Sequence, residues 1–507
     1  MAAPALSLVD RQISVRLFLL SFVCYAYFYA GGGWNQNAQF DLTRAIVERH
    51  TFALDGLKQN SGDISTYGGH TYANKSPGAS FLAVVPYTVL YAAERARGTD
   101  PASSIVETFN CYVSTLVTCG LTGALIPMIL YRLARRRQID RRWAAAVSLI
   151  LALGTQLWAY STVLMAHVPS ASLLFLGFAL LPDTNDDRVS RRRTVAAGLA
   201  AGVSALSNYL CLPALAVLGL LAILRRRRKG DSSYVVSLFA LGALPPLLVL
   251  AIYQKITCGG FFRTPIDTMD SRFVSKHAFL GILRLPQLDA LWGITFSPYR
   301  GLFYFAPVLL TAIVGALFWN RSRRAIPELR LLTLLIAFWI FFNAGFNGWE
   351  GGFGIGSRYL VIAIPFLGLM ILEVRGGLRT LVVAIGALSI FFNFAAVAVD
   401  PQPSGSIPRP MEQYILPLLF TGHFSSTVPI TLPWSSTTFT GHTSVNRVAA
   451  DEPAPFVTAP PDAAASEWAS FNLGEPFLGP GNAASLLPIL LIMIAGSAAI
   501  LRKAATE

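Results

Sequence analysis

The feature that most constrains this chain is a series of apolar runs of about 20 residues, which recur along the whole sequence and alternate with short basic clusters. A helix of that length spans roughly 30 Å of hydrocarbon. The chain is 54% hydrophobic, and only 13% of its residues are charged, about half of the roughly 25% typical of globular proteins. A soluble protein of this composition could not cover its surface with polar groups. The sequence therefore predicts an all-α polytopic membrane protein.

The basic clusters set the predicted topology. The formal net charge is +13, and much of it lies in clusters such as 132–142 and 225–229, between the apolar runs. Such clusters are typical of cytoplasmic loops, so we expect no nucleic-acid partner. All of them fall on one side if the chain forms about 12 transmembrane helices and if 79–93 is a re-entrant or interface-lying helix. The first span is expected at about 14–31, and a tight helical hairpin at about 195–224 is expected to turn near Asn208 and Tyr209. Both termini are then cytoplasmic.

The apolar runs also divide the chain into parts. We expect a polytopic membrane domain over 1–399, which includes an external loop at 32–78. The segment 400–484 is predicted to be a further external segment, because it is rich in Pro, Ser, Thr and Ala, with strand-like pieces such as Ser425–Leu432. The last transmembrane helix and a cytoplasmic tail occupy 485–507. The five cysteines show no CxxC spacing, so the sequence indicates neither a metal site nor a disulfide framework.

The external loop contains the stretch Trp34–Gly78, which is too polar to cross a bilayer. It is predicted to begin with an external amphipathic helix carrying Asp41, and it continues through Asp63 to the turn at Lys75. The predicted topology places it on the same face as three further polar stretches. These are Tyr160–His167, Lys255–Gly301 and Asn347–Tyr359.

The acidic and basic side chains of this face fit one kind of chemistry. A carboxylate can accept the proton of an acceptor hydroxyl, while cations stabilise a departing phosphate. Arg binds phosphate oxygens through a planar fork, and Lys binds them as a point charge. The candidate catalytic acids are Asp41, Asp63 and Glu350, and the candidate phosphate-binding residues are Lys75, Arg300 and Arg358.

Each of these residues also has a purely structural interpretation. Asp41 could be solvated on a helix, Asp63 suits a Ser-Gly-Asp turn, and Lys75 could extend from an apolar run to the interface. Glu48, next to Arg49, is expected to be a surface residue. Arg300 and Arg358 could be plain helix-end charges, although the positive-inside bias makes external Arg less expected there. The spacing alone leaves both interpretations open.

Short motifs then resemble a known family. The stretch Tyr72-Ala73-Asn74-Lys75-Ser76-Pro77 is similar to the Tyr-x-x-Lys-Pro-Pro turn of the C-type (GT-C) membrane glycosyltransferases, with Ser76 in place of the first proline. The likeness is to bacterial relatives of protein O-mannosyltransferases and of the lipid A aminoarabinose transferase. FSPYRGLFYFAP and WEGGFGIGSRYLVIAIPFL also resemble bacterial members of this superfamily. The family's Asp-Glu pair at the start of the external helix is replaced by Asn35, Asn37 and Gln39.

The resemblance implies an inverting transfer of a sugar from a polyprenyl-phosphate donor to a hydroxyl of a glycan, lipid or protein acceptor. The reaction would take place at the periplasmic face of a bacterial inner membrane. Asp41 would be the base, aided by Asp63 or Glu350, and the three cations would hold the lipid phosphate. The family leaves the cofactor open between none and a divalent cation, and no metal ligands are assigned. Candidate substrate-binding residues are Tyr72, His70, His167, Trp349 and Tyr359.

Two other classes of membrane protein stay open. A transporter or flippase of lipid-linked sugars would be expected to carry charges near the bilayer midplane, whereas here the span interiors are almost free of charge. An O-antigen polymerase or ligase usually centres on a large late external loop. The segment 400–484 offers such a loop, but its basic residues are few, namely Arg409 and Arg447.

Overall fold

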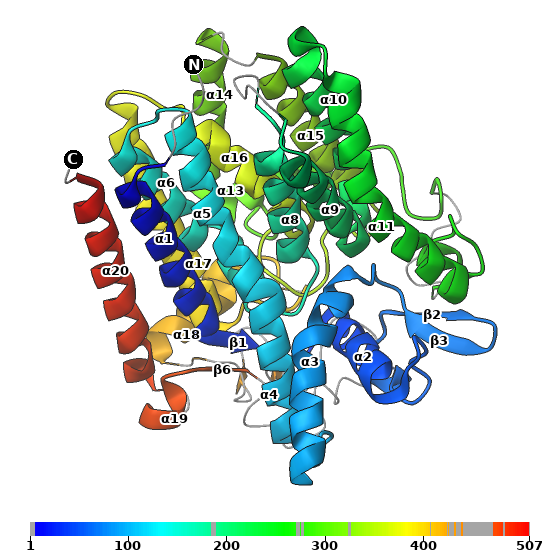
Figure 1. Ribbon diagram of the computed structural model, residues 1–507. Coiled ribbons are helices and arrows are strands. Elements are labelled where there is room, and N and C mark those ends of the chain that lie inside the picture. The colour runs from blue at the N-terminus through cyan, green and yellow to red at the C-terminus, as the bar shows by residue number, and fades with distance from the viewer. Residues whose placement is uncertain are drawn as a thin grey trace.

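The computed structural model is a bundle of helices with three short two-stranded sheets (Figure 1). The described residues are 6–183, 189–269, 274, 278–322, 326–405, 407–422, 424, 430–431, 438–439, 470–479 and 482–505. Most of the predicted external segment 400–484 lies outside them. Of the strand-like piece Ser425–Leu432, only Ile430–Thr431 is described.

The helices of the first half follow the apolar runs and the opening of the external loop. They are α1 (Leu8–Ala26), α2 (Trp34–Arg49), α3 (Gly78–Arg97), α4 (Ser104–Thr115), α5 (Leu121–Arg136), α6 (Arg141–Leu153), α7 (Leu157–Ser161), α8 (His167–Leu180), α9 (Arg191–Ser207) and α10 (Leu212–Arg226).

The second half adds ten helices, and the strands are short. The helices are α11 (Ser232–Cys258), α12 (Leu288–Thr295), α13 (Leu302–Phe305), α14 (Thr311–Arg321), α15 (Ile326–Gly345), α16 (Ile364–Ile371), α17 (Leu378–Val399), α18 (Leu416–Thr421), α19 (Glu475–Leu478) and α20 (Leu487–Ala505). The strands are β1 (Phe28–Ala30), β2 (Ile64–Tyr67), β3 (His70–Ala73), β4 (Ile430–Thr431), β5 (Thr438–Phe439) and β6 (Ser470–Asn472), paired β1–β6, β2–β3 and β4–β5.

Six segments among the described residues are long and apolar enough to cross a membrane, and three shorter apolar helices accompany them. The prediction of a helical protein with several membrane-spanning segments is confirmed at this level, while the count of about 12 spans stays a prediction. The six are Ile105–Arg136, Tyr209–Lys229, Ser232–Cys258, Ile326–Gly345, Leu378–Val399 and Ala483–Ala505.

The first helix is displaced from its predicted span, 14–31. It begins at Leu8, because the Ser7 side chain caps it by accepting the backbone N–H of Asp10 at 3.1 Å. It ends at Ala26, and Phe28–Ala30 form the strand β1 instead. β1 pairs antiparallel with β6 from the far end of the chain, and the local sequence does not predict this pairing. The prediction that the helix continues to residue 31 is therefore wrong.

Helices α9 and α11 pack closely through glycines. Gly198 and Gly202 lie on one face of α9, and a Cβ at Gly202 would lie 2.9 Å from the carbonyl oxygen of Ala243 in α11. Gly242 of α11 likewise faces the backbone of Val195. Small residues four apart let two helix backbones approach, which is a common way to associate helices in a membrane.

Several basic clusters gather at the end of the bundle where both termini lie (Figure 1). Asp10, near the N-terminus, accepts Arg135 from the end of α5 at 2.9 Å. Glu328, at the start of α15, pairs with Arg137 at 2.5 Å and with Arg225 of α10 at 2.8 Å. Helix α2 and the β2–β3 hairpin lie at the opposite end (Figure 1). This grouping agrees with the predicted segregation of charge, while the side of the membrane that each end faces stays a prediction.

Candidate active site

Residues 36–45 of α2 are buried, so that this helix is not a solvated surface element. Two of its polar side chains pair with α3: the Ser80 hydroxyl donates to Gln39 Oε1 at 2.6 Å, and the Thr43 hydroxyl donates to the Ser80 carbonyl at 3.2 Å. Polar pairing at a helix contact fixes register more narrowly than apolar packing, because a shifted partner would leave buried groups unpaired.

Asp41 lies within this buried layer and has no exposed surface. Its Oδ1 accepts the Asn60 side-chain amide at 3.2 Å, and its Oδ2 has no hydrogen-bond partner among the described residues. Burial raises the pKa of Asp41 to about 8, an effect that the nearby Arg44 partly offsets. The carboxyl group is therefore mostly protonated at neutral pH.

Arg44 explains how several ionisable groups can be buried together. It pairs with Glu48 one turn along α2 at 2.8 Å and with Glu107 of α4 at 2.5 Å. Tyr87 of α3 donates its hydroxyl to Glu48 at 2.5 Å, so that this network links α2, α3 and α4. Sequence reasoning took Glu48 for a surface residue, which is wrong, and it missed Glu107. The i, i+4 spacing of Arg44 and Glu48 could have indicated that these two side chains form an ion pair.

The hairpin β2–β3 follows from its two-residue Gly-Gly turn. Gly68 and Gly69 have φ of +61° and +84°, as the tight turns favoured in hairpins require. Asp55 fixes the hairpin from outside, accepting the Thr71 backbone N–H and the His70 ring, each at 2.7 Å. The His70 hydrogen bond holds the pKa of Asp55 below its usual range. His70, predicted to bind substrate, is thus placed in an exposed pair on the hairpin surface.

The register of the hairpin brings Asp63 and Lys75 together. Ile64 pairs with Ala73, so that Asp63 and Asn74 are the next residues to face each other. The Asn74 backbone N–H donates to the Asp63 carbonyl at 3.0 Å, and Lys75 Nζ lies 2.9 Å from Asp63 Oδ1. Both side chains stay partly accessible, at 24% for Lys75 and 12% for Asp63.

Three ring systems lie around two more predicted residues, His167 and Arg358. His167, at the start of α8, lies between Tyr160 and Tyr359, with centroid distances of 5.8 and 5.7 Å. The Arg358 guanidinium lies over the Tyr359 ring at 5.2 Å. Arg358 and Lys75 both lie close enough to His167 to act on it electrostatically.

Asp63 in turn acts electrostatically on Arg358. Both Arg358 Nε and His167 Nδ1 are buried and have no hydrogen-bond partner among the described residues. The structure therefore brings Asp63 and Lys75, from the two ends of the hairpin, near His167 and Arg358, which come from two further segments. We call these four residues the cationic cluster.

Arg300 is close to this cluster but is engaged differently. It is 1% exposed, and its two terminal nitrogens donate to the carbonyls of Gly354 and Gly352, the second at 2.5 Å. A Cβ at Gly351 would lie 3.1 Å from Arg358 Nε. Arg300 thus holds the glycine loop against which the Arg358 side chain packs.

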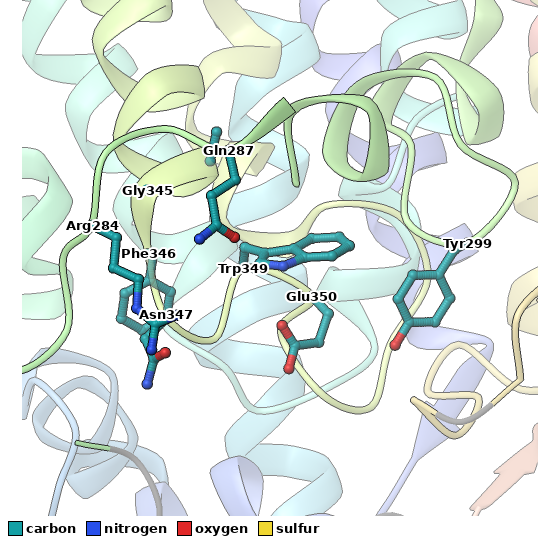
Figure 2. A pocket seen from close by; sticks show the side chains of 9 residues that line it. Arg284, Gln287, Tyr299, Gly345, Phe346, Asn347, Trp349 and Glu350 are labelled. Carbon is teal, nitrogen blue, oxygen red and sulfur yellow. The ribbon is translucent and has the colours of Figure 1, made fainter. Parts of the chain in front are cut away.

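Glu350 and Trp349 line a cavity of about 410 Å³ at the C-terminal end of α15 (Figure 2). Arg284, Gln287 and Tyr299 line it as well, and sequence reasoning did not single them out. Nothing in their spacing marks them, because they come from the segment before α12 and from the turn after it.

One predicted residue remains to be placed. Tyr72 is 7% exposed on β3, and its ring lies 6.4 Å from that of His70. Among the described residues, no group of three or more His, Cys, Asp and Glu side chains is placed to hold a metal ion.

Neither a protein-family model nor a curated protein sequence matches the chain. Among solved structures, it is similar to apo ArnT from Cupriavidus metallidurans, with 14% identity and a TM-score of 0.46 over 98% of this chain and 73% of that one. ArnT bound to undecaprenyl phosphate is matched at 15% identity and a TM-score of 0.43, over 71% of this chain and 59% of ArnT.

A second similarity is to the oligosaccharyltransferase AglB from Archaeoglobus fulgidus. In its complex with an inhibitory peptide and a dolichol-phosphate, AglB is matched at 12% identity and a TM-score of 0.45. The match covers 82% of this chain and 58% of AglB, so that the chain spans less than two thirds of that protein.

Proposed function

We propose that this chain is an integral membrane glycosyltransferase that moves a sugar from a polyprenyl-phosphate donor to an acceptor hydroxyl. The observation that carries the proposal is the cationic cluster. Lys75 occupies the lysine position of the Tyr-x-x-Lys motif and pairs with Asp63 at 2.9 Å. Arg358, whose Nε has no hydrogen-bond partner among the described residues, acts electrostatically on the same His167 as Lys75 does. Two cations and one carboxylate that act on the same surroundings suit a departing phosphate and a hydroxyl that loses its proton.

The transfer is a single displacement. The acceptor oxygen attacks the anomeric carbon of the donor sugar, and the bond between that carbon and the phosphate oxygen breaks. The bonding electron pair leaves with the polyprenyl phosphate, whose charge Lys75 and Arg358 stabilise. The hydroxyl proton passes to the carboxylate of Asp63. A direct displacement of this kind inverts the anomeric configuration.

We propose Asp63 as the base ahead of Asp41. Asp63 is ion-paired and partly accessible, whereas Asp41 is fully buried and holds a proton at neutral pH. A protonated carboxyl cannot accept the hydroxyl proton. Arg300 acts here as a positioning residue, because it holds the glycine loop beside Arg358.

We further propose a bacterial inner-membrane location with the cationic cluster on the periplasmic side and both termini in the cytoplasm. The β2–β3 hairpin lies at the end of the bundle opposite the termini (Figure 1). This placement would let a lipid-linked donor and an acceptor meet at the outer leaflet. The sugar and the class of acceptor are not specified by these residues.

The proposal is tested by measuring release of undecaprenyl phosphate in proteoliposomes supplied with undecaprenyl-phosphate sugars and an acceptor extract. We expect Asp63→Asn to reduce the rate about 10²–10⁴-fold, as for removal of a general base. Lys75→Gln and Arg358→Gln should each reduce it strongly, and Asp41→Asn should leave it within a few-fold of the wild type. Lys58→Gln, an exposed lysine of the same loop, is the matched control. Equal rates for Lys75→Gln and Lys58→Gln would contradict the proposal.

A further inference from the structure

The cavity of Figure 2 is lined by none of the four residues of the cationic cluster, and its chemistry differs from theirs. Its volume of about 410 Å³ lies within the roughly 300–1,000 Å³ typical of small-molecule sites. Its polar walls are supplied by Arg284, Gln287, Asn347 and Glu350 and its aromatic walls by Tyr299, Phe346 and Trp349. The transfer proposed above uses none of these side chains.

Two backbone segments are held together to form one wall. The Arg284 N–H donates to the Gly345 carbonyl at 2.7 Å, and the Gln287 N–H donates to the Ala344 carbonyl at 3.1 Å. A Cβ at Gly345 would lie 2.5 Å from the Arg284 carbonyl oxygen, so that only glycine allows this approach. The polar side chains of this wall are therefore carried by a fixed backbone.

The Trp349 indole is held at two of its edges. A Cβ at Gly293 of α12 would overlap the indole ring, which therefore rests directly on the helix backbone. The Tyr299 ring meets it edge-on at 6.1 Å, and the Tyr299 hydroxyl donates to the Gly405 carbonyl. Figure 2 shows the Gln287 amide and the Glu350 carboxylate next to the indole.

We propose that this cavity binds a saccharide ring, an assignment that rests on the proposed function for the class of ligand. A fixed indole offers a flat apolar surface to the C–H face of a sugar. Carboxylate, amide and guanidinium groups around it can accept or donate the hydrogen bonds of several hydroxyls. The one carboxylate and the one guanidinium of the lining, Glu350 and Arg284, balance in charge, which suits an uncharged polar ligand, and the polar groups disfavour a lipid tail.

The cavity and the cationic cluster share a wall. The Phe346 ring, which lines the cavity, packs on the Tyr359 ring at 5.4 Å, and Tyr359 lies beneath the Arg358 guanidinium. A saccharide bound against Trp349 would therefore lie next to the phosphate-binding residues. The ring could belong to the donor or to a glycan acceptor, and a binding measurement separates the two.

The test is equilibrium binding to the full-length protein in detergent, with no transfer required. The probes are methyl glycosides of hexoses and pentoses, undecaprenyl phosphate alone, and undecaprenyl-phosphate hexose and pentose. We expect Trp349→Ala and Glu350→Gln to weaken saccharide binding at least about 10-fold, and Trp349→Phe to retain part of it. Trp292→Ala, at a tryptophan that is 59% exposed on α12, should change affinity less than twofold.

The pattern across probes identifies the source of the saccharide. If the variants weaken methyl glycosides, the ring is that of an acceptor. If they weaken only the undecaprenyl-phosphate sugars, and not undecaprenyl phosphate, the ring is that of the donor. Unchanged affinities in Trp349→Ala, or a wild type that binds no saccharide probe above undecaprenyl phosphate, would overturn the site. If the protein binds saccharides but transfers no sugar, the binding site would be supported and the proposed reaction contradicted.

Discussion

Two aspartates of the same loop show how position decides chemistry at the scale of one residue. Asp41 faces the packed interior between α2, α3 and α4, where its carboxyl group loses its hydration. Asp63 lies at the open end of a hairpin beside Lys75, where its charge has a partner. The sequence predicts both as candidate bases, because it gives the residue type but not the exposure of each side chain to water.

The buried carboxyl group of Asp41 makes stability depend on pH. Its pKa rises from an ordinary value of 3.8 to about 8, so the folded protein retains a proton that the unfolded chain has released. Stability should therefore fall as pH rises from about 4 through 8, by up to about 1.4 kcal/mol per pH unit. Asp41→Asn should remove this component. The measurement is the thermal unfolding midpoint in detergent between pH 5 and 9.

An exposed aspartate provides the comparison for that measurement. Asp100→Asn, in the turn between α3 and α4, should keep the wild-type slope of stability against pH. If Asp41→Asn keeps the same slope of stability against pH as Asp100→Asn, the pKa of Asp41 is the same in the folded protein as in the unfolded chain. The assignment of Asp41 as a buried, protonated acid would then be wrong.

At the scale of elements, the position at which α3 begins determines where Lys75, the lysine of the Tyr-x-x-Lys motif, lies. Pro77 precedes this helix, and its first residue, Gly78, faces the last residue of α9. A Cβ at Gly78 would lie 2.6 Å from the backbone nitrogen and Cα of Ser207. The turn that carries Lys75 can reach the cationic cluster because a glycine lets the two helix ends approach.

Adding one methyl group at this contact should be costly. Gly78→Ala forces backbone atoms apart, and overpacking of this kind destabilises a fold by about 1–3 kcal/mol. We also expect transfer activity to fall, because Lys75 moves with the helix start. Gly219→Ala in α10, where a Cβ would meet no atom within 4 Å, should be neutral or stabilising by up to about 1 kcal/mol.

Thermal unfolding and transfer rate, measured on both glycine variants, check this prediction. A Gly78→Ala protein as stable and active as Gly219→Ala would mean that the contact with Ser207 is not tight. If Gly78→Ala loses activity but keeps its stability, the loss would be attributed to a displaced Lys75.

At the scale of the whole molecule, charge and termini divide the bundle into two ends. The ion pair of Asp10 links the N-terminal region to the basic end of α5, and the ion pairs of Glu328 link the start of α15 to Arg137, just after α5, and to Arg225 at the end of α10. Helix α2 and the hairpin occupy the other end (Figure 1). A basic end is retained on the cytoplasmic side during insertion, which predicts that the cationic cluster faces outward.

Cysteine labelling of intact cells checks this orientation. All five native cysteines are buried, so the parent protein should react little with a membrane-impermeant maleimide. Lys58→Cys, in the external loop, should be labelled in intact cells. Arg228→Cys, in the basic cluster after α10, should be labelled only after the cells are opened. Labelling of Arg228→Cys in intact cells would reverse the topology and contradict the proposed outward-facing site.

The sequence alone determined the helical, membrane-spanning class of the fold and several breaks between helices. Apolar runs longer than a core helix needs, with basic clusters between them, specify membrane-spanning helices. The break at Asn208 was read correctly between α9 and α10, because its side chain caps the following turn by accepting the Leu210 N–H at 3.0 Å. The Gly198-x-x-x-Gly202 spacing was a further available signal for close helix packing, and it was not used.

Only the tertiary structure decided which of the predicted polar residues meet. It joined Asp63 and Lys75 to His167 and Arg358, and it buried Asp41 beside Arg44. It also built the cavity around Trp349 from segments that share no sequence pattern. The reason is physical: periodicity and local propensity act over one or two turns of chain. Burial and electrostatic environment depend on segments brought together from distant parts of the sequence.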